Sequence, residues 1–229
     1  WNSNPRSVRP ASRSLHMVFI DLTLVVVDDE ENVTTSQSLT GMSLADGLAW
    51  AKEALGSEKA LANRDYAMPE HSVGQGGVFG TANESFVELG RYYTSATALL
   101  DELAASEEGA TAIAVWPHHF DLGGILFVPT EDGKKMDPEQ APQIGFGMSP
   151  GDEAIPEPYF YITPWPIPEG AKLPALENGA TWHTEGFTGA ILHASTLVEN
   201  AGVAEQRTNV ERYFQGVLAA SRNLIAGRP

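Results

Sequence analysis

Two short segments of this 229-residue chain combine histidine with carboxylate side chains. The first is HHFD at residues 118–121, which opens a run of strand-forming residues, and the second holds His183 and Glu185. In an extended strand alternate side chains share a face, so we expect His119 beside Asp121 and His183 beside Glu185. The two pairs can act on one substrate only if their segments, which are distant in sequence, approach each other in the fold.

The chemistry of these pairs depends on whether they converge. Two imidazoles and two carboxylates together suit Zn²⁺, Mn²⁺ or Fe²⁺, because imidazole is a borderline ligand and carboxylate is a hard one. Without a metal, the same groups could serve as a general acid and a general base. A third interpretation is a hydrogen-bonded network that fixes proline-rich loops. The predicted metal ligands are His119, Asp121, His183 and Glu185, and the predicted catalytic residues are these four with Glu157 and, on the opposite face of its strand, His118.

Aromatic residues accompany these polar groups along the sequence. Aromatic walls with a few polar contacts are typical of small-molecule and sugar pockets, although ordinary cores share the pattern. In the segment EPYFYI, alternation sends Tyr159 and Tyr161 to one side of a strand and Phe160 and Ile162 to the other, so one side is more polar. The predicted ligand-binding residues are Trp116, Asp152, Tyr159, Tyr161, Trp165 and Trp182.

One segment matches the sequence pattern of a serine hydrolase but lacks a group that the mechanism requires. Residues 147–151 match G-x-S-x-G, and Asp152 and His183 follow in the order Ser, Asp, His. In a nucleophile elbow the residue after the serine donates its backbone N–H to the oxyanion, and Pro150 has no N–H to donate. The segment is better interpreted as a turn with proline and glycine at its centre.

Composition restricts the partners of the protein. The net charge is −16, whereas nucleic-acid binding needs clustered Lys and Arg, so nucleic acid and anionic membrane surfaces are poor partners. The absence of cysteine excludes disulfides and a cysteine nucleophile, and no run approaches the roughly 20 apolar residues of a membrane span. We expect a soluble, cytoplasmic protein with a small-molecule ligand. Because the sequence starts at Trp1 and not at Met, we expect a processed or truncated chain, with a removed signal peptide as one alternative.

Strand and helix signals alternate along the chain. Ser43-x-x-Asp46 and Thr81-x-x-Glu84 resemble capping boxes that open two helices, and Gly56 follows the first of them. An antiparallel sheet with helices packed on one side, an α+β fold, accommodates this order of elements. We interpret residues 1–16 as a flexible basic segment and 17–229 as one domain with possible halves 17–110 and 111–229. The predicted strands are 16–29, 33–39, 111–116, 120–129, 143–148 and 159–163, and the predicted helices are 43–55, 81–108 and 203–226.

Six segments of the chain form a recognisable set: Asp21–Asp28, Met68–His71, Trp116–Leu122, Gly147–Asp152, Glu157–Pro166 and Trp182–Leu192. Through these segments the chain, from about Asp21 onward, resembles an uncharacterised bacterial family of hypothetical proteins. The resemblance implies no activity, because no function is known for that family, and it implies further sequence upstream of Trp1. Its polar and aromatic motifs lie in the later half of the chain, where we place the site.

Three functional hypotheses follow from these observations. The first is a metal-dependent hydrolase or related enzyme that acts on a small polar substrate through the His and carboxylate residues. The second is a non-catalytic protein whose aromatic-lined pocket binds a carbohydrate or another small molecule. The third is a structural or partner-binding protein in which the motifs only fix the fold. Substrate, metal identity and oligomeric state are left open by the sequence.

Overall fold

The computed structural model describes residues 13–58, 70–116, 119–129, 137–138, 140–199 and 202–227. The chain forms two compact units, Trp1–Tyr92 and Tyr93–Pro229, each of which is described separately below. The boundary between the two units lies inside helix α2 (Glu84–Ser106). None of the described helices is long and apolar enough to cross a membrane.

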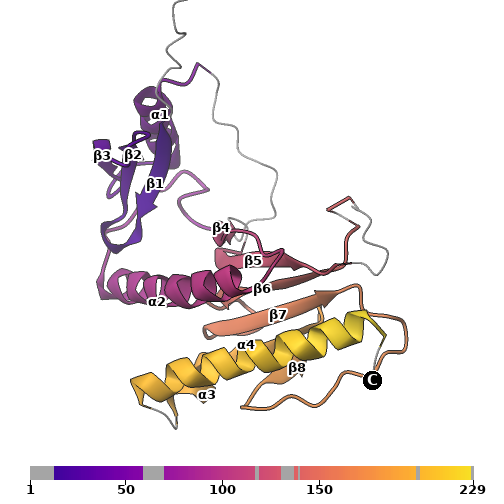
Figure 1. Cartoon of the computed structure of the whole chain (residues 1–229). Coiled ribbons are helices and arrows are strands. Elements are labelled where there is room, and N and C mark those ends of the chain that lie inside the picture. Colours follow the sequence, from indigo (N-terminus) through magenta and orange to yellow (C-terminus); the bar gives the residue numbers. More distant parts are fainter. Residues whose placement is uncertain are drawn as a thin grey trace, which may run out of the picture. The chain divides into compact units, whose positions relative to one another are not determined.

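The first unit contains a three-stranded antiparallel sheet in the order β1-β2-β3 (Figure 1). The predicted strand 16–29 is divided in two, because a 3-10 turn at Phe19–Asp21 ends in Leu22 with a left-handed φ of 52°. The two halves pair as a hairpin, and the predicted pairing with residues 33–39 is made by the second half. The strands are β1 (Ser14–Val18), β2 (Thr23–Val27) and β3 (Val33–Ser38).

Helix α1 (Leu44–Leu55) follows the predicted limits closely. The Ser43 hydroxyl accepts a hydrogen bond from the Asp46 N–H at 3.1 Å, which satisfies one of the free N–H groups of the first turn. At the other end Gly56 has a φ of 63°, a left-handed conformation that glycine adopts without steric cost. Local sequence signals therefore determine both ends of this helix.

The second unit contains a six-stranded antiparallel sheet in the order β4-β5-β6-β7-β9-β8. This arrangement confirms the predicted α+β class with a mostly antiparallel sheet. The four predicted strands of this region are found within three residues of their expected limits. The strands are β4 (Ala114–Trp116), β5 (Asp121–Phe127), β6 (Gln143–Ser149), β7 (Tyr159–Trp165), β8 (Thr181–His183) and β9 (Gly189–His193).

One face of this sheet is apolar and is covered by helix α4 (Val203–Ile225) (Figure 1). The rings of Phe160 on β7 and Phe214 on α4 pack edge to face, with centroids 5.7 Å apart. The buried Tyr213 hydroxyl donates a hydrogen bond of 2.7 Å to the carbonyl oxygen of Ala190 on β9. We call this side the helix-covered face. Because the apolar side chains of these strands are buried under α4, the opposite face of the sheet can carry polar side chains.

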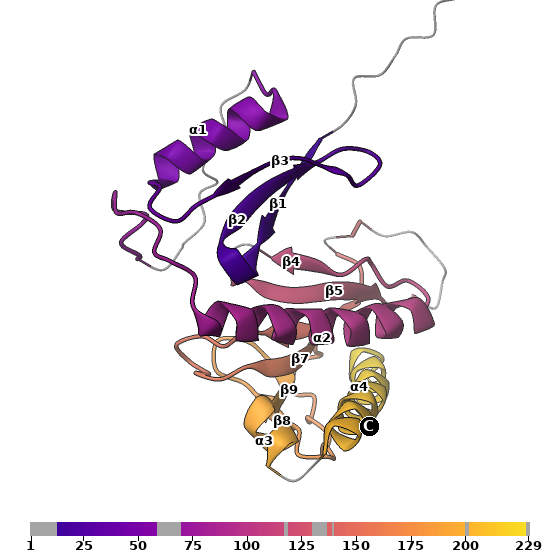
Figure 2. The same cartoon turned by 90° about the vertical axis from the view of Figure 1, so that its left-hand side faces the viewer.

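Helix α2 is joined to α4 by ion pairs. Arg207 of α4 contacts Glu102 of α2, and Arg222 contacts Glu107. The start of α2 differs from the prediction: the Asn83 side chain, and not Thr81, accepts an N–H of the first turn, at 2.9 Å from Ser85. Tyr93, Ala96 and Leu100 are the buried residues of this helix. Figure 2 shows the length of α2 from a second side.

Candidate functional site

The polar face of the six-stranded sheet carries a row of functional side chains at one end. Asp121 opposes Trp116, Ser149 opposes Tyr159, and Tyr159 opposes His193. Residues directly opposite each other in antiparallel strands project from the same face. The β4–β5 turn, the β6–β7 loop and the start of helix α3 (Ala194–Val198) meet at this end. We define the sheet-end cluster as His119, Asp121, Ser149, Asp152, Glu157, Tyr159, Tyr161, His193 and Ser195.

Asp121 receives a hydrogen bond from a tyrosine two strands away. The Tyr161 hydroxyl on β7 donates to Asp121 Oδ2 on β5. Its ring crosses the intervening strand β6 at Gly147 and its hydroxyl lies over Gly123 of β5, since a Cβ added at either glycine would lie 2.6 Å from the Tyr161 hydroxyl oxygen. Burial, and then the charge of Asp121, raise the pKa of Tyr161 far above its ordinary value. Tyr161 is therefore a proton donor at every physiological pH.

A second phenol lies close to the same carboxylate. The hydroxyl of Tyr93 on α2 donates to the carbonyl oxygen of Phe120, the residue before Asp121. The rings of Tyr93 and Phe120 pack with centroids 5.8 Å apart. Burial and the charge of Asp121 raise the pKa of Tyr93. The Tyr93 hydroxyl therefore fixes the turn that leads into Asp121.

Asp152 organises the β6–β7 loop. Its Oδ1 accepts the N–H groups of Ala154 and Ile155 at 2.8 and 2.9 Å, and its Oδ2 accepts the Tyr159 hydroxyl at 3.0 Å. Burial opposes ionisation of Asp152, but these hydrogen bonds and the nearby charge of His119 outweigh it and lower the pKa. Asp152 is an anchored carboxylate.

Tyr159 links this carboxylate to the sheet. Burial raises the pKa of Tyr159 to about 12, although a hydrogen bond from Ser149 acts in the opposite direction. Ser149 is itself only 4% exposed, and its hydroxyl accepts the N–H of Gly151 at 3.1 Å. The loop is consequently held to the ends of β6 and β7 by a continuous series of hydrogen bonds.

Glu157 contacts a histidine and a serine at the end of β9. Its Oε2 accepts the backbone N–H of Ser195 at 2.9 Å, and its Oε1 accepts the Ser195 hydroxyl at 3.1 Å. These bonds, led by the backbone N–H, hold the pKa of Glu157 below its usual value. Nδ1 of His193 lies 3.3 Å from Glu157 Oε1 and is shielded from solvent. The imidazole thus lies at ion-pair distance from an ionised carboxylate.

The expected convergence of His183 and Glu185 with His119 and Asp121 is not formed. Strand β8, which ends at His183, is four interstrand steps from β5, or about 19 Å at the usual spacing. His183 Nε2 lies 2.6 Å from the Glu185 carbonyl oxygen, and its ring packs on Phe187. Within the described residues no group of three or more His, Asp or Glu is placed to hold a metal ion. His118 lies outside the described residues.

The six predicted ligand-binding residues are only partly brought together. Trp116, which donates its indole N–H to Gly123 O at 3.2 Å, belongs to the row at the sheet end with Asp152 and the two tyrosines. Trp165 is at the opposite end of β7 and 46% exposed. Trp182 opposes Ala190 and donates to Pro174 O at 2.8 Å. The single aromatic pocket expected from the sequence is therefore divided.

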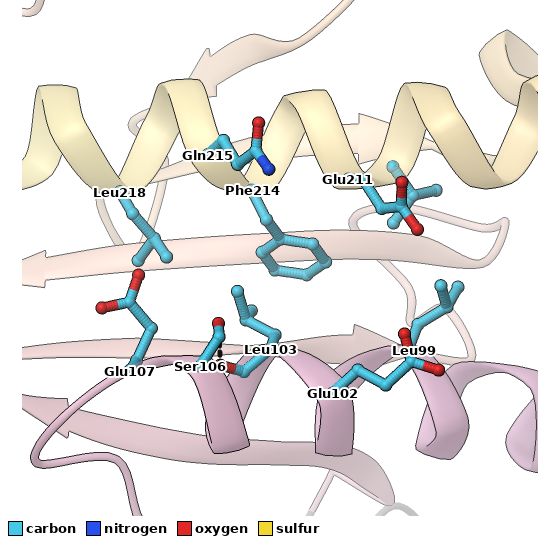
Figure 3. A pocket seen from close by; sticks show the side chains of 10 residues that line it. Leu99, Glu102, Leu103, Ser106, Glu107, Glu211, Phe214, Gln215 and Leu218 are labelled. Atoms are coloured by element: carbon cyan, nitrogen blue, oxygen red, sulfur yellow. Dashed lines mark hydrogen bonds between the residues drawn. The ribbon is translucent and has the colours of Figure 1, made fainter.

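A cavity of about 320 Å³ lies between α2 and α4, beside the helix-covered face of the sheet (Figure 3). Figure 3 shows Phe214, Leu218 and Leu103 pointing into it from the two helices. Its carboxylates are already paired, Glu102 and Glu211 with Arg207 and Glu107 with Arg222. The cavity contains no histidine, and the sheet separates it from the sheet-end cluster.

Sequence reasoning missed His193 and Ser195, the partners of Glu157. The signal was present in GAILH, residues 189–193, where Ile191 and His193 alternate with apolar residues of the opposite face. His193 ends an otherwise apolar strand, just as Asp121 begins one.

Searches of protein-family models, curated proteins and solved structures find no match to this chain.

Proposed function

We propose that the protein is an enzyme that acts on a small polar substrate by general acid–base catalysis, in a hydrolytic or related reaction, at the sheet-end cluster. The observation that carries this proposal is the pairing of His193 with Glu157. A histidine whose one ring nitrogen faces an anchored carboxylate is the arrangement by which many enzymes orient a general base and stabilise the imidazolium that forms.

The geometry assigns different tasks to the two ring nitrogens of His193. Nδ1 is shielded from solvent and faces Glu157, so Nε2 is the nitrogen that exchanges a proton with the substrate. Glu157 is itself fixed by two hydrogen bonds from Ser195, which limits its rotation. The side chain of His193 is 31% exposed, which allows a substrate to reach the ring.

The remaining members of the cluster suit recognition of a polar substrate. Tyr161 retains its proton and Asp152 retains its negative charge, so the cluster contains both a hydrogen-bond donor and a hydrogen-bond acceptor. Asp121 lies three interstrand steps from His193, roughly 14 Å at the usual spacing. The carboxylate–tyrosine pair and the histidine base therefore contact different parts of one substrate.

A divalent metal was another interpretation of these residues in the sequence. Two of its four expected ligands, His183 and Glu185, belong to the opposite end of the sheet, so the proposal assigns the chemistry to side chains alone. His119 keeps a role near Asp152 as a charged or hydrogen-bonding group.

The test compares two histidine variants on a panel of chromogenic esters, amides, phosphate esters and glycosides. We expect His193→Gln to lose turnover by roughly 10²- to 10⁴-fold, the usual contribution of a general base. His183→Gln is the matched control, since it makes the same change at the other end of the sheet and should leave the rate within about twofold. Absence of turnover across the panel, or equal losses in the two variants, would contradict the proposal.

A further inference from the structure

Among the described strands, β1 forms an edge of the three-stranded sheet and pairs only with β2. It is the first strand in the order β1-β2-β3, and all five of its residues are exposed. Large apolar side chains gather there: Leu15 is 37% exposed, Met17 39%, Val18 36%, and the following Ile20 50%. An open edge with free N–H and C=O groups is a template for another strand.

The other described sheet edges are protected in ways that β1 is not. The edges of the six-stranded sheet, β4 and β8, are only three residues long, which limits pairing. The edge formed by β3 is mostly Thr, Ser and Gln, and its register shifts at Val26/Val27. Strand β1, with the sequence SLHMV, has neither charge nor proline.

We propose that β1 pairs in antiparallel fashion with β1 of a second copy of this chain. Pairing about a two-fold axis at His16 places Leu15 opposite Met17 of the second copy, and Met17 opposite its Leu15. Both side chains project from the face of Val26, because Leu15 opposes Val26 in the β1–β2 pair. The face of the sheet that holds the buried Val26 thereby continues from one copy into the other.

A second copy of β1 can pair with this edge because the uncharged strand is complementary to itself. A two-fold interface uses one surface twice, and a strand without charges places no like charges opposite each other. In this register Arg13 of one copy lies opposite Phe19 of the other, at the start of the turn Phe19–Asp21. Two three-stranded sheets then form one sheet of six strands with no exposed β1 edge.

A single engineered cysteine gives a direct test, since the chain contains no cysteine. Directly opposite residues of antiparallel strands have Cα atoms roughly 4.5 to 5.5 Å apart, within the range that a disulfide spans. We expect His16→Cys to form a covalent dimer under mild oxidation. Ser36→Cys, an exposed position in β3, is the matched control and should stay monomeric. Equal cross-linking of the two variants would overturn the proposal.

A second pair of variants tests the interface without oxidation. Met17→Lys places a charge against Leu15 of the second copy, whereas Val33→Lys adds the same charge on β3, where Val33 is 61% exposed. Light scattering should give a dimer mass for the wild type and Val33→Lys and a monomer mass for Met17→Lys. Added Lys reduces the net charge of −16, so general repulsion cannot explain a loss of the dimer. A monomeric wild type, or equal masses for both variants, would overturn the pairing.

Discussion

Replacement of Gly147 by alanine should strongly destabilise the second unit. A Cβ at this position would collide with the Leu122 carbonyl oxygen of β5 and would lie 2.6 Å from the Tyr161 hydroxyl oxygen. The backbone of a central strand cannot move away, so the tyrosine must give up its hydrogen bond to Asp121. Overpacking costs about 1–3 kcal/mol and loss of a hydrogen bond to a charged group about 1.5–3 kcal/mol, so we expect a total near 3–5 kcal/mol.

The assay is urea unfolding followed by tryptophan fluorescence, with Tyr161→Phe and Gly216→Ala measured alongside. Tyr161→Phe removes only the hydrogen bond and should cost about 1.5–3 kcal/mol. Gly216→Ala adds a Cβ on α4 where nothing lies within 4 Å, and should be neutral or stabilising by up to about 1 kcal/mol. A loss below about 1 kcal/mol for Gly147→Ala would refute the argument that the glycines exist to admit the Tyr161 ring.

Three further predictions concern pH, coupling and capping. Folding lowers the pKa values of Asp152 and Glu157, so the ionised carboxylates stabilise the folded state at pH values above their ordinary pKa values of 3.8 and 4.5. This contribution to the free energy of unfolding is lost as the pH falls further. Urea titrations at several pH values should show the loss, and the loss should be smaller in Asp152→Asn. His119→Ala and His183→Ala should have additive effects on unfolding free energy within about 0.5 kcal/mol, because four interstrand steps separate their strands, whereas a coupling above that would indicate a shared metal. Ser43→Ala should cost about 1 kcal/mol and Ser43→Gly only a few tenths in thermal unfolding, and equal costs would contradict the capping role.

Local signals predicted much of the fold correctly. Helix α1 begins after Ser43 and ends at Gly56 because capping and a left-handed glycine act within one turn of the chain. Alternation in EPYFY correctly placed Tyr159 and Tyr161 on one face, since the two-residue period of a strand is a local property. The left-handed Leu22, which splits the first predicted strand, carries no such local signal, because leucine is not a typical residue for that conformation.

The sequence by itself determined which residues could do chemistry and, for residues inside a strand such as Tyr159 and Tyr161, on which face they lie. His119 and Glu185 lie just outside β5 and β8, so the strand alternation expected for them does not apply. Only the tertiary structure decided which of the candidate residues meet. Strand β9 lies between β7 and β8, so the turn that holds Glu185 lies at the far end of the sheet, while His193 is brought beside Glu157. Alternation fixes a face, but strand order and register depend on contacts between distant segments, which no local pattern encodes.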